Sequence, residues 1–311
     1  MRTRNAITYT RYHTSASCFP RYSSYSPMGQ ADTKPRKKVT IQTLRNLYRK
    51  GEPIAALTAY DYPSGLVADA AGMVVVLVGD SLAMVAMGME DTNEVTMEEM
   101  LVHCRSVSRA VKSAFLIADL PFGSYEVSPE QAVVSSLKMI KEGGARAAGI
   151  PVMAHIGLTP QRQHSLGGFR VQAKSVAGAA QLLRDVIAVQ DAGAFMILVE
   201  AVPAEVAALI TKRLCVPTIG IEAGNGCSEQ VLVQGDVVGN FPLGRDLPRF
   251  VKTYADVWGE MIRGIGQYRC DVKSSEFPSE FTYNQAFPQQ NPTEFQRLVE
   301  RSAEGNDEPY Y

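Results

Sequence analysis

From about residue 39, hydrophobic positions fall into short continuous apolar runs, which are separated by longer stretches with helical spacing. Most runs are rich in Val and Ile, as expected for strands that are buried on both faces of a parallel sheet. The pattern predicts seven strands, at Ile54–Thr58, Val74–Val78, Phe115–Ala118, Ile150–Ile156, Phe195–Val199, Val216–Ile221 and Val231–Val233.

Helices are predicted before and between these strands, at 40–50, Thr96–Lys112, Ser128–Glu142, Val176–Ala192 and Ala204–Leu214. Repeated strand–helix units with polar residues at the strand ends are typical of a TIM-type (β/α)8 barrel, whose active site lies on that face. A doubly wound open sheet is the alternative. No G-x-G-x-x-G follows the first strand, which argues against a dinucleotide-binding version of that alternative.

The strand count is one short of a closed eight-stranded barrel. The predicted helix that ends near Glu142 is followed by only seven residues, Gly143–Gly149, before the next strand begins. A complete strand–helix unit needs roughly 17 residues, about 6 for the strand and about 11 for the helix. We therefore predict a TIM-type (β/α)8 barrel in which one strand–helix unit is missing.

The two ends of the chain differ in composition from its centre. Residues 1–31 contain Arg, Ser, Thr and Tyr but no acidic residue, which is typical of a mitochondrial transit peptide. The alternative is a basic tail without targeting function, on a cytoplasmic protein. Polar residues dominate from about Pro278. We expect a leader over 1–35, a catalytic barrel over 36–277 and a largely disordered tail over 278–311.

The overall composition excludes several classes of protein. The 311 residues carry a net charge of −1, which gives no electrostatic reason to expect nucleic acid as a partner. No apolar run reaches the roughly 18 residues that span a bilayer, so we expect no membrane segment. The five cysteines are scattered and form no CxxC pair, which argues against a zinc site or a disulfide framework.

Two carboxylates follow directly after predicted strands. Asp80 and Asp119 each come at the end of a buried apolar run. Because the carboxyl ends of barrel strands share one mouth, we expect both side chains to point into it. Carboxylate oxygens suit Mg²⁺, which binds through one or two carboxylates and keeps positions for water and substrate. The alternative is that each Asp caps the helix that follows it.

Two further polar residues end strands and face the same mouth. Glu200 closes the string FMILVE, where partial burial would raise its pKa and suit it to be a general base. A structural, salt-bridged Glu is the alternative reading. His155 follows IPVMA, where a lone histidine is more often a packed core residue, and its place at the strand end makes substrate contact the alternative.

The sequence resembles the ketopantoate hydroxymethyltransferase family, over residues 40 to about 275. The matching strings are LTAYDYPSGLVADAAG (57–72), VLVGDSLAM (76–84), ADLPFGSYEVSPEQA (118–132), HIGLTPQ (155–161), GGFRVQAKS (167–175), LVEAVPAEVA (198–207) and IGIEAGNGCSEQVLV (219–233). The strings occur in the family's order, and the basic leader is similar to that of fungal members.

The resemblance implies a (β/α)8 barrel of the phosphoenolpyruvate/pyruvate-like group, a homo-oligomer and a Mg²⁺ ion. It implies that a hydroxymethyl group passes from 5,10-methylenetetrahydrofolate to 3-methyl-2-oxobutanoate, which gives 2-dehydropantoate by metal-assisted enolisation. By motif, Asp80 and Asp119 are the metal ligands and also lie near the substrate. Ser81 contacts the substrate carboxylate, His155 lines the pocket, and Glu200 is the base that transfers the proton.

The chain also departs from the family pattern. The family's K-x-E-G-G motif, on the strand between the ADLP and HIGLTP strings, is absent here. Three family glycines are replaced, by Ala154, Ala173 and Glu222, and a charged side chain at the last position is expected to disturb a close backbone approach. These departures leave two alternatives to an active enzyme. One is a catalytically impaired barrel that serves as a structural subunit, and the other is a different Mg²⁺-dependent barrel related to phosphoenolpyruvate mutase or isocitrate lyase.

Overall fold

A computed structural model describes residues 36–145, 149–242, 244, 247–278, 296–297 and 299–301. The predicted leader over 1–35 lies outside the described residues, and so does most of the predicted tail over 278–311. Among the described helices, none is both long and apolar enough to cross a membrane.

The seven predicted strands are all present, and they form one sheet in which every neighbouring pair is parallel. The strands are β1 (Ile54–Thr58), β2 (Val75–Val78), β3 (Phe115–Ala118), β4 (Met153–Gly157), β5 (Met196–Glu200), β6 (Thr218–Ile221) and β7 (Glu229–Leu232). Their order in the sheet is β3-β2-β1-β7-β6-β5-β4. The first and last strands of the chain therefore pair with each other, as in a TIM-type barrel.

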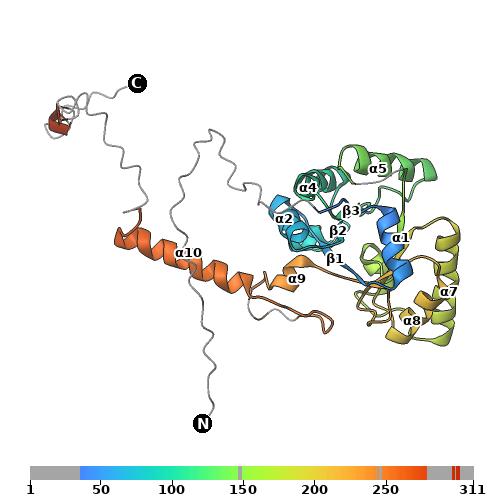
Figure 1. Cartoon of the computed structure of the whole chain (residues 1–311). Helices are drawn as coiled ribbons and strands as arrows, with labels where there is room; N and C mark the ends of the chain where they lie inside the picture. Colours follow the sequence, from blue (N-terminus) through green and yellow to red (C-terminus); the bar gives the residue numbers. More distant parts are fainter. Residues whose placement is uncertain are drawn as a thin grey trace, which may run out of the picture.

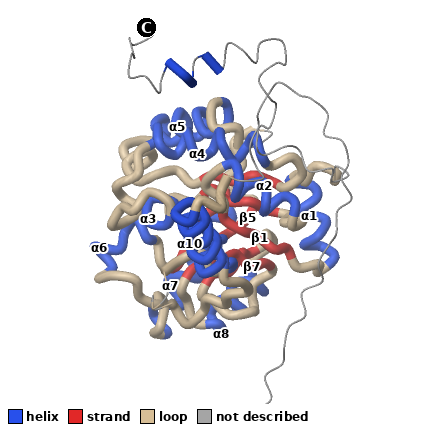
Figure 2. Tube along the Cα trace, turned by 90° about the vertical axis from the view of Figure 1, so that its left-hand side faces the viewer, coloured by secondary structure: helices blue, strands red, loops and turns tan. Residues whose placement is uncertain are grey.

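Helices surround this curled sheet (Figures 1 and 2). They are α1 (Ile41–Lys50), α2 (Tyr62–Ala70), α3 (Leu82–Val85), α4 (Met97–Ala110), α5 (Pro129–Lys141), α6 (Gln163–Leu166), α7 (Val176–Asp191), α8 (Ala204–Arg213), α9 (Gln234–Val238) and α10 (Val257–Ser274), with a 3₁₀ turn at Pro160–Arg162. The five helices predicted from hydrophobic periodicity begin within one residue and end within two residues of their predicted bounds.

Cap residues fix the starts of several helices. The hydroxyl of Thr96 accepts a hydrogen bond from the backbone N–H of Glu99, and the Glu99 carboxylate accepts from the backbone N–H of Thr96 in return. This reciprocal pairing is a capping box, which begins α4 at a defined residue. Ser128 caps α5 and Ser175 caps α7 in the simpler one-bond manner.

The ring of strands is interrupted at one place only among the described residues. Consecutive strands pair throughout, except that β3 pairs with β2 but not with β4, and β4 pairs with β5 but not with β3. The connection between them is the segment 142–152, of which residues 146–148 are outside the described part. The predicted position of a missing strand–helix unit therefore coincides with the interruption.

The prediction that these strands are buried on both faces is wrong for β4 and for the end of β3. Every residue of β2 is buried, whereas β4 has one buried residue, Ile156, and exposes His155. The physical reason is that β3 and β4 are edge strands here, so the neighbour that would cover their outer sides is not part of the sheet.

Candidate active site

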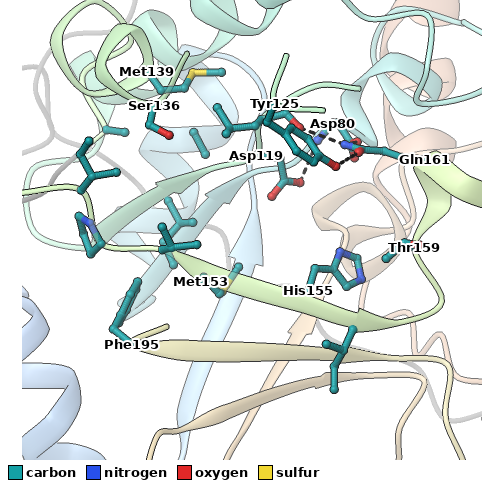
Figure 3. Close-up of a pocket in the computed structure, with 18 of the residues that line it drawn as sticks. Asp80, Asp119, Tyr125, Ser136, Met139, Met153, His155, Thr159, Gln161 and Phe195 are labelled. Atoms are coloured by element: carbon teal, nitrogen blue, oxygen red, sulfur yellow. Dashed lines mark hydrogen bonds between the residues drawn. The ribbon is translucent and has the colours of Figure 1, made fainter. Parts of the chain in front are cut away.

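Asp80 and Asp119 lie against each other at the carboxyl ends of β2 and β3. The backbone N–H of Asp80 donates a hydrogen bond to Oδ2 of Asp119 over 3.1 Å. The backbone N–H of Asp119 donates to the carbonyl oxygen of Val78 over 3.0 Å, which continues the β2–β3 ladder up to the two carboxylates. Figure 3 shows both side chains at the upper wall of one cavity.

Neither carboxylate is a helix cap, so the capping alternative is wrong. The short helix α3 begins after Ser81 and has no side-chain cap bond, and α5 is capped by Ser128. A Cβ atom on Gly79 would lie 3.2 Å from the Ser81 hydroxyl and 3.3 Å from Oδ2 of Asp119. The predicted substrate residue Ser81 therefore lies beside the two carboxylates.

Burial and the negative charges of neighbouring carboxylates raise the pKa of both Asp80 and Asp119. Burial, followed by the negative charge of Asp119, raises the pKa of Asp80 to about 7. Burial also raises the pKa of Asp119, and the charge of Glu200 adds to that rise. Both effects disfavour two negative charges at one buried place, so a cation bound there would be stabilised by both carboxylates.

The residues present fit Mg²⁺ on the chemistry of their donor atoms. Mg²⁺ is commonly held by one or two carboxylates while water and substrate fill its remaining positions. Asp80 and Asp119 supply two such carboxylates. No cluster of three or more His, Cys, Asp or Glu with the geometry of a metal site occurs in the part of the chain that the structure describes. The fit therefore rests on two carboxylates with open positions, not on a closed protein cage.

Glu200 and His155 form the opposite wall of the mouth. They end neighbouring strands, since β4 and β5 pair with His155 next to Leu198. Nε2 of His155 lies 3.1 Å from Oε2 of Glu200, and the two side chains are 34% and 19% exposed. Burial lowers the pKa of His155, but its hydrogen bond to Glu200 and the charges of Glu200, Asp119 and Asp80 outweigh that effect and raise the pKa.

The backbone around Glu200 is tightly constrained. Gly157 has a φ of 88°, and a Cβ there would lie 2.1 Å from the carbonyl oxygen of Glu200. Only glycine allows β4 and β5 to approach this closely, which brings His155 to Glu200. Ala201, directly after Glu200, has a φ of 48°, a left-handed conformation that costs a residue with a side chain roughly 1–2 kcal/mol. The strain turns the chain sharply after the predicted base.

Two site residues were missed when the sequence was interpreted. Nε2 of Gln161 donates hydrogen bonds to Oδ2 of Asp80 over 2.7 Å and to the carbonyl oxygen of Leu120 over 3.0 Å. The hydroxyl of Tyr125 donates to Oε1 of Gln161. Both residues lie inside the strings HIGLTPQ and ADLPFGSYEV, so the motif match contained them, but their residue types alone gave no signal.

A cavity of about 610 Å³ runs from this mouth down between β3 and β4. At its upper end it is lined by Asp80, Asp119, His155 and Gln161, and lower down mostly by apolar residues that include Phe115, Ile117, Ile150, Val152, Met153 and Phe195. The volume lies in the usual range for small-molecule sites. Ser81 and Glu200 are outside this lining, although each is bonded or adjacent to a residue within it.

The fold and the site together define an α/β-barrel enzyme whose mouth presents an acidic pair opposite a carboxylate–histidine pair. The comparisons with known proteins agree with this class. The chain belongs to the ketopantoate hydroxymethyltransferase family, whose model matches it in two stretches, residues 38–148 and 146–280.

Relatives from distant organisms share most of the chain. It is 59% identical to a 3-methyl-2-oxobutanoate hydroxymethyltransferase of Emericella nidulans, with 92% of this chain and 87% of the relative covered. It is 46% identical to an enzyme of that name from Oleidesulfovibrio alaskensis, with 80% and 90% covered. It is also 46% identical to a mitochondrial enzyme of that name from Oryza sativa, with 78% and 66% covered.

The alignments also show that relatives have residues which this chain lacks. The fungal alignment spans 305 positions, yet 92% of the 311 residues here is about 286, which leaves about 19 positions without a residue of this chain. The bacterial alignment spans 267 positions against 80% of the chain, about 249 residues, which leaves about 18. The two stretches of the family match overlap at 146–148.

Solved structures with a similar fold include a 2,3-dimethylmalate lyase of the PEP mutase/isocitrate lyase superfamily. Its TM-score is 0.47 at 16% identity, with 85% of this chain and 96% of that chain covered. An oxaloacetate acetylhydrolase has a TM-score of 0.48 at 14% identity, with 88% and 100% covered. Likeness of this extent does not bear on activity.

Proposed function

We propose that this chain transfers a hydroxymethyl group from 5,10-methylenetetrahydrofolate to 3-methyl-2-oxobutanoate, which gives 2-dehydropantoate for pantothenate synthesis. Membership of the family supports the reaction. The observation that carries the proposal is the opposition of Asp80 and Asp119 to the pair formed by Glu200 and His155, at the mouth of one cavity. The first pair suits a cation and the second suits proton transfer.

Asp80 and Asp119 would hold Mg²⁺ through their carboxylates, with the Ser81 hydroxyl beside them for the substrate carboxylate. When bound, Mg²⁺ supplies the positive charge that makes the C3 proton of a 2-oxo acid more acidic. Gln161 holds the Asp80 carboxylate in place, because its amide donates to Oδ2. Tyr125 in turn fixes the orientation of that amide.

Glu200 is the base that removes the C3 proton of the substrate. Its carboxylate is oriented by Nε2 of His155, and the strained turn at Ala201 fixes the direction of the strand end. Water hydrolyses the two carbon–nitrogen bonds of the methylene group, which releases tetrahydrofolate and leaves that carbon as formaldehyde. The electron pair left at C3 then bonds to the formaldehyde carbon, and its oxygen takes up the proton that Glu200 removed and becomes the new hydroxyl. His155 stabilises the Glu200 carboxylate before transfer and lines the substrate pocket.

Proton exchange tests the first half of this reaction without the folate. In D₂O with Mg²⁺, we expect the chain to exchange the C3 proton of 3-methyl-2-oxobutanoate for deuterium. Proton NMR measures this exchange as loss of the C3 proton signal. Glu200→Gln should reduce exchange at least about 100-fold, since general base catalysis contributes about 10²–10⁴. Glu205→Gln, which changes an exposed carboxylate at the start of α8, should leave the rate unchanged. Exchange no faster than in buffer with Mg²⁺ alone would refute the proposal.

The second candidate function is a catalytically impaired barrel that acts as a structural subunit. The unpaired edges of β3 and β4 favour it, because a barrel with one open side leaves the substrate cavity less enclosed. Absence of Glu200-dependent exchange in a correctly folded chain would support this second candidate over the first.

We also propose that the chain forms a homo-oligomer through α10. Met261, Ile265, Tyr268 and Val272 follow one another at spacings of four, three and four residues, and they are 46% to 62% exposed. Figure 1 shows α10 projecting from the strands, and no residue of this helix is buried. Heptad spacing of this kind is typical of helix pairing, so a second copy of α10 is the occupant we expect. Ile265→Glu should then lower the mass measured by light scattering, and an unchanged mass would contradict this assignment.

For location, we propose that residues 1–35 direct the protein to the mitochondrial matrix. The composition of the segment supports this, and so does the mitochondrial name of the rice relative. A fluorescent protein fused after residue 35 should co-localise with a matrix marker. Cytoplasmic fluorescence would favour the alternative location.

A further inference from the structure

The open side of the barrel lies between β3 and β4, which do not pair with each other. Among the described strands, all other consecutive pairs are joined by hydrogen bonds and β7 pairs with β1, so β3 and β4 are the one consecutive pair left apart. The residue counts agree, because relatives carry about 18 or 19 more residues in the alignment. That number matches one strand–helix unit of roughly 17 residues.

The space between β3 and β4 is suited to a peptide backbone. The cavity extends along the full length of both strands, from Phe115 at the start of β3 to His155 near the end of β4. Each strand pairs on one side only, so the N–H and C=O groups on its other side face the cavity. Such an edge favours the addition of an extended peptide.

The walls of this slot are mostly apolar and belong to two layers. The strand layer contributes Ile117 and Met153, and the helix layer contributes Met139 from α5 and Leu182 from α7. Near its lower end, Ile150 and Val152 remain 38% and 53% exposed. Apolar side chains left open to solvent at the edge of a sheet are those that an added strand and helix would cover.

We propose that the slot between β3 and β4 is a binding site for a strand–helix peptide supplied from outside this chain. The peptide's strand runs parallel to β3 and β4 and pairs with both, and its apolar side chains cover Ile150 and Val152. The occupant has about the length of the 19 residues by which the fungal relative exceeds this chain in the alignment, and the overlap of the two family matches at 146–148 favours this place in the sequence for them. The proposal rests on family membership and on the sheet, and not on the proposed activity.

Fluorescence anisotropy tests the binding directly. The probe is a labelled synthetic peptide with the residues that the Emericella nidulans relative carries opposite the gap, added to the full chain. We expect saturable binding and, by hydrogen exchange, new protection of backbone amides in β3 and β4. A peptide with proline at the centre of its strand cannot donate to the ladder, and it should bind at least about tenfold more weakly. A scrambled peptide should behave in the same way.

Two variants of the chain localise the binding. Ile117→Glu places a charge in the slot and should abolish binding, whereas Ile262→Glu on the exposed face of α10 should not alter it. Glu200→Gln should bind the peptide normally, which separates this proposal from the proposed activity. Binding that is absent, or equally strong for the proline and scrambled peptides, would overturn the proposal. Protection of β3 and β4 that rises with the concentration of the chain alone would also overturn it, because a second copy would then fill the slot.

Discussion

The folded barrel is expected to lose unfolding free energy as the pH rises above neutral, and Glu229→Gln is expected to remove most of that loss. Glu229 begins β7, between Ile54 of β1 and Ile219 of β6, at the end of the barrel opposite the active site. Its side chain is buried, with 2% exposure, and neither carboxylate oxygen has a hydrogen-bond partner among the described residues. Burial raises the pKa of Glu229 from 4.5 to about 8.

Because the pKa of Glu229 is raised on folding, the barrel loses stability as the pH rises. Because the folded state binds the proton more tightly than the unfolded state, stability is full below the unfolded pKa of 4.5 and falls as the pH rises towards about 8. Each pKa unit corresponds to about 1.4 kcal/mol, so the loss across this window is about 3–5 kcal/mol. A folded domain has only about 5–15 kcal/mol of stability, and a loss of this size would be readily measured.

Urea unfolding at several pH values between 5 and 9 measures the effect. Unfolding is monitored by circular dichroism and not by tryptophan fluorescence, because the single tryptophan lies in the peripheral helix α10. Since glutamine does not titrate, the difference in unfolding free energy between the two proteins isolates Glu229. We expect near equality at pH 5 and a variant more stable by about 3–5 kcal/mol at pH 9. Glu52→Gln, at an exposed carboxylate, is the control and should show no such trend. Parallel pH profiles for the wild type and Glu229→Gln would refute the reasoning.

Three other substitutions have definite expected outcomes. Asp80→Asn should reduce turnover at least about 100-fold, and retained turnover would contradict the metal assignment. Because the pKa of the buried Asp80 carboxyl group is raised to about 7, the substitution removes a destabilising charge at pH 8 but not at pH 5. The melting temperature should therefore rise more at pH 8 than at pH 5. Ala173→Gly and Glu222→Gly should each stabilise the protein by about 0.5–1 kcal/mol in urea unfolding, because φ is 53° and 52° at these positions; a loss of stability in either variant would contradict the assigned strain.

The sequence predicted the order of the seven strands and of five helices, because both depend on local pattern, but helices such as α2 and α10 were not predicted. Continuous Val- and Ile-rich runs marked the strands, and helical spacing of hydrophobic positions marked the helices. The strand count located the interruption, since a parallel strand needs a connection of fixed minimum length. Two replaced family glycines, at 173 and 222, indeed require left-handed backbone, whereas Ala154 does not have a positive φ.

Properties that depend on neighbours distant in the sequence could not be predicted. The exposure of His155 follows from the strand that does not cover β4, and not from the apolar run before it. Glu200 was interpreted either as a general base or as a salt-bridged structural residue. In the structure it lies at the barrel mouth and is also paired with His155. Gln161 and Tyr125 join the site through loops that only the folded chain brings to Asp80. The unpartnered carboxylate of Glu229 gave no signal in a strand of ordinary pattern.

Turnover tests the central claim that these seven strands carry the family's catalytic residues and lack one structural unit. The measurement is formation of 2-dehydropantoate from 3-methyl-2-oxobutanoate and 5,10-methylenetetrahydrofolate with Mg²⁺, by the chain and by a variant that has the fungal relative's segment inserted between Ala145 and Gly149. We expect the inserted variant to turn over at least about 100-fold faster, because closure of the barrel completes and encloses the site, and to lose that activity with Asp80→Ala. A correctly folded inserted variant without activity, or a chain that is equally active without the insertion, would contradict the account.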